Sequence, residues 1–266
     1  MKIALLQTTV YRSKEDNLKE AAEFAAEAAS LGADIAILPE MFNCPYETEC
    51  FPEYAEERGG ESWSALAAAA RDNHINLVGG SIPERRDGKL YNTSFVFDRE
   101  GNEIAFHSKA HMFDIDIEGK QSFRESDSFT PGDRATVFEA DGHTLGLAIC
   151  FDIRFPELFR KTALLGAEAI FVPAAFNMTT GPLHWELSFR MRAVDNQLFT
   201  IGCAPARARN GKYVSWANSL VCDPWGKVLV NAGEEAGVTL CEADLSEVAS
   251  VRKQLPILSA RRPGIY

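Results

Sequence analysis

Three side chains with the reactivity needed to hydrolyse an amide, Glu40, Lys109 and Cys150, end or follow apolar runs of the chain. A thiol can attack a carbonyl carbon, and a carboxylate can accept the proton that the thiol gives up. An ammonium can stabilise the oxygen on which negative charge then develops. Together, these three groups could hydrolyse an amide without a metal ion.

Two of these side chains close segments that have the pattern of buried strands. Glu40 ends the apolar run 33–40, and Cys150 ends the run 144–150. Because open α/β sheets carry their sites at the carboxyl ends of strands, we expect Glu40 and Cys150 at one rim of a sheet. Taken singly, a cysteine after an apolar run is more often a small buried hydrophobe, and a glutamate at a strand end is more often a solvated cap.

Length and composition describe an ordinary globular protein. We interpret 1–266 as a single domain, although 266 residues could hold two. Its 46% hydrophobic and 24% charged residues are typical of globular chains. The net charge of -11 disfavours nucleic acid and anionic membranes as partners. Because the amino terminus turns polar too early for a signal peptide and no apolar run approaches the ~18 residues of a membrane span, we expect a cytoplasmic protein.

The cysteines, histidines and glycines lack the spacing of metal or cofactor sites. The six cysteines include no C-x-x-C pair, so we expect reduced thiols rather than a zinc site or a disulfide framework. His107 and His111 lie four residues apart, but no third ligand follows at a usual spacing. The glycine pairs 59–60 and 79–80 lack the strand and helix that flank a nucleotide-binding loop. We expect no metal and no cofactor.

The chain contains an internal repeat. The corresponding segments are 32–43 with 166–177, 78–83 with 200–205, and 94–101 with 219–226. Short matches of this kind recur by chance in α/β proteins, but three matches in the same order favour a duplicated unit. Each unit has the pattern strand, helix, strand, helix, strand, strand, which predicts two sheets face to face with helices outside.

Local signals place several elements. Ser13 and Asp16 predict the start of a helix that runs roughly from Lys14 to Leu31, and a second helix is expected from about Pro156 to Leu165. A glycine follows each helix. Strands are expected over 90–98 and 213–222. Two segments lie outside the repeat: a loop over 110–131, and a tail from about 246 to 266 that we expect to pack on another surface, such as a second subunit.

Three motifs resemble those of the nitrilase superfamily of carbon-nitrogen hydrolases, over essentially the whole chain. They are 39–42 around the glutamate, 107–114 around the lysine, and 150–157 from the cysteine onward. Segments 175–186 and 192–197 look like omega-amidase signatures. True nitrilases typically carry Trp-Glu after the nucleophile, whereas this chain has Phe151 and Asp152, which weakens a nitrile-hydrolysing interpretation.

The resemblance implies a fold, an assembly and roles for the site. The fold is an α/β class αββα sandwich of four layers, and the assembly is a homodimer or a larger set of dimers. Cys150 would be the nucleophile and Glu40 its base, while Lys109 and the backbone N–H of Phe151 would stabilise the oxyanion. A second glutamate is implied in the 110–131 loop, where Glu125 lies. The resting protonation state of Cys150 stays open, because a carboxylate disfavours the thiolate and an ammonium favours it.

The implied substrate is a small amide, a 2-oxo dicarboxylate monoamide such as 2-oxoglutaramate or 2-oxosuccinamate. Arg154 is the best-placed cation for its distal carboxylate, and an ion pair with Glu157 is the structural alternative. Tyr46 and Thr180 are further hydroxyl candidates. Alternative activities are hydrolysis of deaminated glutathione, of N-carbamoyl amino acids or of nitriles. From another class, the chain could be a non-catalytic scaffold of the same fold.

Overall fold

The computed structural model describes residues 1–118, 121–208 and 212–265, and it contains two large sheets. The first sheet consists of β1 Lys2–Gln7, β2 Ile35–Ile37, β3 Asn76–Val78, β4 Ile82–Arg86, β5 Lys89–Phe97, β6 Glu103–Ser108 and β15 Gly237–Glu242. The second consists of β9 Thr136–Ala140, β10 His143–Leu147, β11 Ala169–Pro173, β12 Phe199–Cys203, β13 Leu220–Cys222 and β14 Val228–Asn231. The helices are α1 Lys14–Ser30, α2 Cys50–Tyr54, α3 Glu61–Asn73, α4 Pro156–Leu164, α5 Gly181–Asn196 and α6 Glu247–Gln254.

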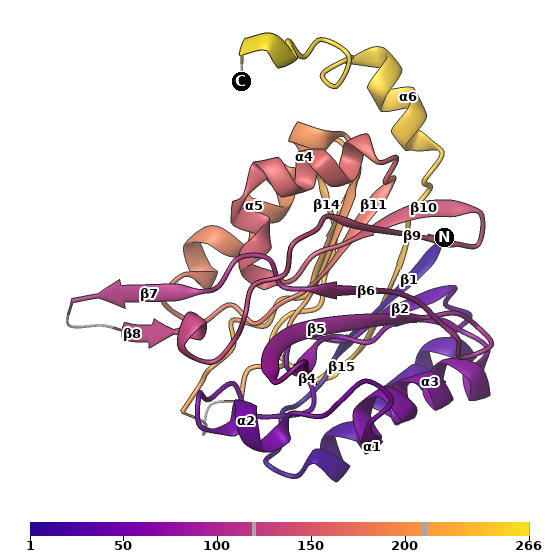
Figure 1. The fold of residues 1–266 in the computed structure, drawn as a ribbon. Helices are drawn as coiled ribbons and strands as arrows, with labels where there is room; N and C mark the ends of the chain where they lie inside the picture. The colour runs from indigo at the N-terminus through magenta and orange to yellow at the C-terminus, as the bar shows by residue number, and fades with distance from the viewer. Residues whose placement is uncertain (119–120, 209–211, 266) are drawn as a thin grey trace.

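The two sheets pack face to face, with helices on both outer faces (Figure 1). The central core joins side chains of both sheets, such as Ile35 from the first and Phe171 from the second. On the outer face of the first sheet, alanines of α1 and α3 pack against the strands. On that of the second, Phe159 of α4 and Phe189 of α5 do the same. These layers confirm the predicted α/β sandwich and its αββα order.

The sequence repeat corresponds to a repeat in strand order and direction. In the first sheet β15 and β1 are antiparallel, β1, β2 and β3 are parallel, and β5 and β6 return antiparallel. In the second sheet β9 to β14 follow the same scheme. The register shifts between Val96 and Phe97 in one half and between Val221 and Cys222 in the other, which are equivalent positions of the repeat.

The two predicted helices form close to their expected limits. The Ser13 hydroxyl accepts a hydrogen bond from the backbone N–H of Asp16 at 3.1 Å, which satisfies one of the free N–H groups at the start of α1. Both α1 and α4 end one residue earlier than expected, and each is followed by a glycine with positive φ, Gly32 at 78° and Gly166 at 104°. Glycine allows this left-handed conformation at little cost.

Two expectations, the loop over 110–131 and the strand over 213–222, were wrong in detail. The predicted loop over 110–131 holds a hairpin, β7 Asp114–Ile117 paired with β8 Gln121–Arg124, and a short 3-10 turn η1, Glu125–Asp127. The hairpin forms because 114–117 alternates aspartate and isoleucine, the period of a strand. In the predicted strand 213–222 only β13 is a strand, since Ala217 and Asn218 have positive φ.

The carboxyl-terminal tail is partly ordered by contacts within the chain. Val248 and Val251 of α6 are buried, and the Arg252 guanidinium donates to the carbonyl oxygen of Ala167 at 2.9 Å. Beyond α6 the chain includes a 3-10 turn η3, Pro263–Ile265, and stands away from the sandwich (Figure 1). Tyr266 lies outside the described residues. Within the described ranges, every helix is too short or too polar to cross a membrane.

Candidate active site

A buried cluster of three charged side chains forms the centre of the site. Lys109 follows β6, and its Nζ lies 2.8 Å from Oε1 of Glu40 and 3.0 and 2.7 Å from Oε1 and Oε2 of Glu125. All three side chains are fully buried. One ammonium therefore bridges two carboxylates that would otherwise repel each other. The sequence resemblance placed these residues in one site, and the structure brings them together.

Glu40 and Cys150 meet across the two sheets, not along one rim. Glu40 follows β2 of the first sheet, whereas Cys150 follows β10 of the second. The expectation of a single sheet was wrong because the duplicated halves form separate sheets. Cys150 begins the 3-10 turn η2, Cys150–Arg154, with a φ of 45°. Such a left-handed conformation costs about 1–3 kcal/mol for a residue other than glycine, so the surrounding structure must hold it.

The electrostatics favour a protonated thiol and a charged ammonium. Burial raises the pKa of Cys150 well above its ordinary value, the charge of Glu40 raises it further, and Lys109 offsets only part of the effect. Burial acts to lower the pKa of Lys109, but the Glu125 and Glu40 carboxylates outweigh it and raise that pKa. Burial likewise raises the pKa of Glu125 against the opposing effect of Lys109. Burial and the Glu40 charge thus act against the thiolate of Cys150, and Lys109 acts in its favour.

Hydrogen bonds to Glu40 and Glu125 come from residues that sequence reasoning missed. The side-chain amide of Asn92, in β5, donates to Oε1 of Glu40 at 2.9 Å and to Oε1 of Glu125 at 3.1 Å. The backbone N–H of Phe113 donates to Oε2 of Glu125 at 2.6 Å. Only the polar character of Asn92 within a buried strand could have drawn attention to it. Oε2 of Glu40 is buried without a hydrogen-bond partner in the described part of the chain, which leaves an acceptor for a proton.

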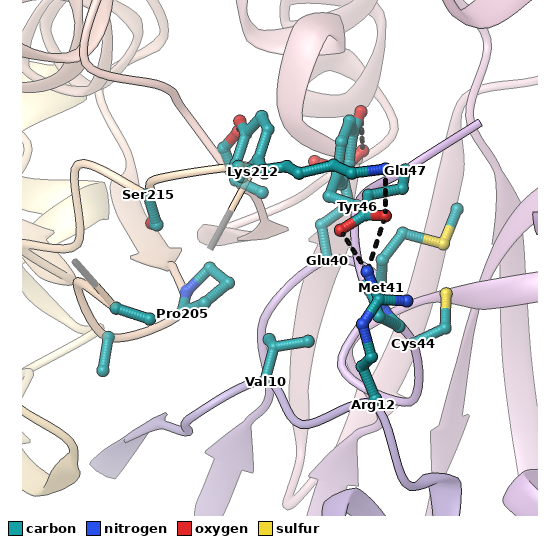
Figure 2. Close-up of a pocket in the computed structure, with 15 residues that line it drawn as sticks. Val10, Arg12, Glu40, Met41, Cys44, Tyr46, Glu47, Pro205, Lys212 and Ser215 are labelled. Atoms are coloured by element: carbon teal, nitrogen blue, oxygen red, sulfur yellow. Dashed lines mark hydrogen bonds and ion pairs between the residues drawn. The ribbon is translucent and has the colours of Figure 1, made fainter. Parts of the chain in front are cut away.

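Two neighbouring hollows open at the cluster. Cys150 lines the smaller one together with Phe151, Arg154 and Thr180, three of the candidate substrate-binding residues. The larger is a cavity of about 390 Å³ that Glu40 and Tyr46 line. Arg12, Glu47 and Lys212 also line this cavity, and both cations pair with Glu47, as Figure 2 shows. Ala175 lines both hollows.

Arg154 has the environment of a cation without an anionic partner. Its Nη1 contacts Nδ1 of His184 at 3.1 Å, and its guanidinium lies 5.6 Å from the ring of Phe151 and 5.1 Å from that of Phe176. Burial lowers the pKa of Arg154. The alternative ion pair with Glu157 does not form, and no carboxylate pairs with Arg154 among the residues that the structure describes.

The two hydroxyl candidates differ in what they contact. The Tyr46 hydroxyl donates to Oε1 of Glu40 at 3.5 Å, so it reaches the catalytic cluster. The Thr180 hydroxyl donates to Oδ1 of Asn177 at 3.2 Å and is thus engaged in holding its own turn. The aromatic ring of Phe151 packs at 5.3 Å from that of Phe113. Of the two hydroxyls, only that of Tyr46 touches a proposed catalytic group.

His107 and His111 meet at a carboxylate and do not face each other as a metal pair would. Nε2 of His107 lies 3.0 Å from Oδ2 of Asp152, and Nδ1 of His111 lies 2.7 Å from Oδ1. Within the described residues no group of three or more metal-ligating side chains occurs. The two histidines, four residues apart in the sequence, therefore both contact the buried carboxylate of Asp152.

Comparisons with known proteins agree with this geometry. The model of the family described as carbon-nitrogen hydrolase matches residues 2–253. The omega-amidase NIT2 of Mus musculus is 46% identical over 265 residues, which cover 100% of this chain and 96% of that protein. Nit3 of Saccharomyces cerevisiae, a member of the nitrilase superfamily, has a TM-score of 0.90 at 37% identity, covering 98% of this chain and 96% of that chain. A mutant of the Nesterenkonia AN1 amidase from the same superfamily has a TM-score of 0.82 at 26% identity, covering 100% and 95%. The chain therefore belongs to the carbon-nitrogen hydrolase family.

Proposed function

We propose that the protein is an omega-amidase that hydrolyses 2-oxoglutaramate or 2-oxosuccinamate to the 2-oxo dicarboxylate and ammonia. The observation that carries the proposal is the position of Arg154, which lines the same hollow as Cys150 and has no carboxylate partner in the described residues. A thiol beside an unpaired guanidinium suits an amide that carries a carboxylate at its other end. The names of the full-length relatives support this choice of amide.

The reaction begins with the Cys150 thiol and the Glu40 carboxylate. As the sulfur attacks the amide carbon, Glu40 accepts the thiol proton, and Lys109 together with the backbone N–H of Phe151 stabilises the oxygen on which charge develops. Glu40 then returns the proton to the amide nitrogen, the carbon–nitrogen bond breaks, and ammonia leaves. Cys150 is left as a thioester.

The second half of the reaction regenerates the thiol. Glu40 takes a proton from water, the oxygen attacks the thioester carbon, and the carbon–sulfur bond breaks. Glu40 gives its proton back to the sulfur, and the new carboxyl group leaves as part of the 2-oxo dicarboxylate. Glu125 holds Lys109 through two contacts, at 3.0 and 2.7 Å, so its role in both halves is to position the ammonium and to serve as a second acid or base.

We further propose a cytoplasmic homodimer or assembly of dimers. The outer face of α5 exposes Leu183, Leu187 and Met191, which are 72%, 65% and 47% exposed and lie four residues apart on one side of the helix. An apolar stripe of this kind supports a contact with a second copy. All six cysteines are free, in agreement with a reducing compartment. Cell fractionation tests the location.

Ammonia release from a panel of substrates tests the proposed activity. The panel contains 2-oxoglutaramate, 2-oxosuccinamate, deaminated glutathione, an N-carbamoyl amino acid and an aliphatic nitrile. We expect the two 2-oxo dicarboxylate monoamides to have the highest kcat/KM. A higher kcat/KM for a carbamoyl compound or a nitrile would contradict the proposal.

A further inference from the structure

Asp152 is a fully buried carboxylate two residues after Cys150 that accepts hydrogen bonds from two separate parts of the backbone. The N–H of Ile149 donates to Oδ2 at 3.0 Å. The N–H groups of Ala110 and His111 donate to Oδ1 at 3.2 and 3.0 Å. Asp152 is not one of the described residues that line the two hollows of the site. Its contacts are with the protein itself.

Two histidines complete the hydrogen bonding of Asp152. His107 and His111 contact its two oxygens at 3.0 and 2.7 Å. The other ring nitrogen of His107 lies 3.0 Å from the Thr136 hydroxyl, and the ring of His111 stacks on that of Phe155 at 3.6 Å. Burial acts to raise the pKa of Asp152, but the hydrogen bonds of His107 and His111 lower it below the usual range, so the carboxylate stays ionised.

We propose that Asp152 is a positioning residue that fixes the turn carrying Cys150 against the segment that follows Lys109. Its donors Ala110 and His111 come directly after Lys109, and its donor Ile149 comes directly before Cys150. One carboxylate therefore sets the position of the ammonium relative to the thiol. The inference rests on the proposed function, in which these two groups act on a single carbonyl.

The positions of the two catalytic residues show why such a connection is needed. Lys109 follows β6 of one sheet and Cys150 follows β10 of the other, so no strand pairing holds them together. Cys150 also has a φ of 45°, a conformation that its own side chain does not favour. Loss of the Asp152 carboxylate would leave three backbone N–H groups, of which that of Ile149 is buried, without this acceptor and would let the two segments move apart.

Replacement of the carboxylate by an amide tests the proposal. In Asp152→Asn we expect kcat for 2-oxoglutaramate to fall about 100-fold, the usual effect of displacing a catalytic group by about 1 Å. KM should change by less than about threefold, because the substrate contacts remain. Alkylation of Cys150 by iodoacetamide, followed by mass spectrometry, should also become slower at each pH, because the ammonium no longer favours the thiolate. Asp152→Glu keeps the charge and should recover part of both losses.

Two further variants keep the test decisive. His111→Ala removes one donor at a half-buried position and should lower kcat by about 3- to 10-fold, the effect of a single hydrogen bond. Glu84→Gln is the matched control: Glu84 is also buried and pairs with Arg58 and Arg86, but lies outside the catalytic cluster. It should lower the melting temperature without changing kcat or the alkylation rate.

The outcomes separate this inference from the proposed function. Unchanged kcat and alkylation in folded Asp152→Asn would overturn the inference. If that variant does not fold, unchanged values in His111→Ala would overturn it, and so would equal losses in Glu84→Gln. Alkylation needs no substrate, so altered alkylation in a protein that does not hydrolyse 2-oxoglutaramate would support the positioning role and reject the amide assignment.

Discussion

At the scale of single residues, the buried cluster holds one positive charge between two carboxylates and disfavours ionisation of the Cys150 thiol. Ionising Cys150 as well would place a third negative group beside Lys109 in a buried site. Burial and the Glu40 charge raise the pKa of Cys150 for this reason. The thiol therefore gives up its proton during attack, and Glu40 lies where it can accept it.

Substitutions within the cluster should separate these roles. Cys150→Ala should abolish turnover, because no nucleophile remains, and Glu40→Gln should abolish it because the base is lost. Glu125→Gln should lower kcat by roughly 10²- to 10⁴-fold, the usual contribution of an acid-base group. Steady-state ammonia release measures all three. Near-normal activity in Glu40→Gln would reject Glu40 as the base.

Arg154 should distinguish substrates by their charge. In Arg154→Ala, kcat/KM for 2-oxoglutaramate should fall roughly 10- to 150-fold, because a charged hydrogen bond contributes about 1.5–3 kcal/mol. A short neutral amide should lose much less. Arg154→Lys keeps the positive charge but loses the planar guanidinium that can bind a carboxylate through two hydrogen bonds, so kcat/KM should be intermediate. Equal losses for both substrates, with a lowered melting temperature, would show that Arg154 has a structural role only.

At the scale of elements, the sequence predicts what depends on local pattern and repeat. The cap at Ser13, the glycines after α1 and α4, and the order of strands in each half are local or periodic signals, and the structure confirms them. Asn92 and Asp152 could not be assigned this way. Asn92 acts on Glu125, 33 residues further along the chain. Asp152 accepts from the N–H groups of Ala110 and His111, which come near it only when the two sheets pack.

The link that Asp152 makes between these elements should contribute stability that depends on pH. Its pKa in the folded protein is lowered below the ordinary value of about 3.9, so the folded state favours the ionised form. This contribution is fully present above pH ~4 and is lost as the pH falls through the folded-state pKa. The melting temperature of wild type should therefore exceed that of Asp152→Asn at pH 7, and the gap should narrow below pH 4. A gap that stays constant or widens on acidification would contradict this link.

At the scale of the whole molecule, the exposed apolar face of α5 sets the expected assembly. Leu187→Arg places a charge at the centre of this face and should convert a dimer into a monomer, as measured by light scattering. Leu31→Arg is the matched control, since Leu31 is 46% exposed at the end of α1 on the opposite outer layer. A chain that ends at Leu255 keeps α6 and lacks the rest of the tail. Light scattering on this shorter chain tests whether the tail contributes to the dimer. A monomeric wild-type protein would refute the proposed dimer.

The central claim is that Cys150 carries the acyl group of the substrate between two half-reactions. Acid quenching of wild-type protein during turnover of 2-oxoglutaramate, followed by mass spectrometry of its peptides, tests it most directly. We predict a 2-oxoglutaryl thioester on the peptide that contains Cys150, and no such adduct in Cys150→Ala. Ammonia release without an adduct on Cys150, or an adduct on another residue, would contradict the claim.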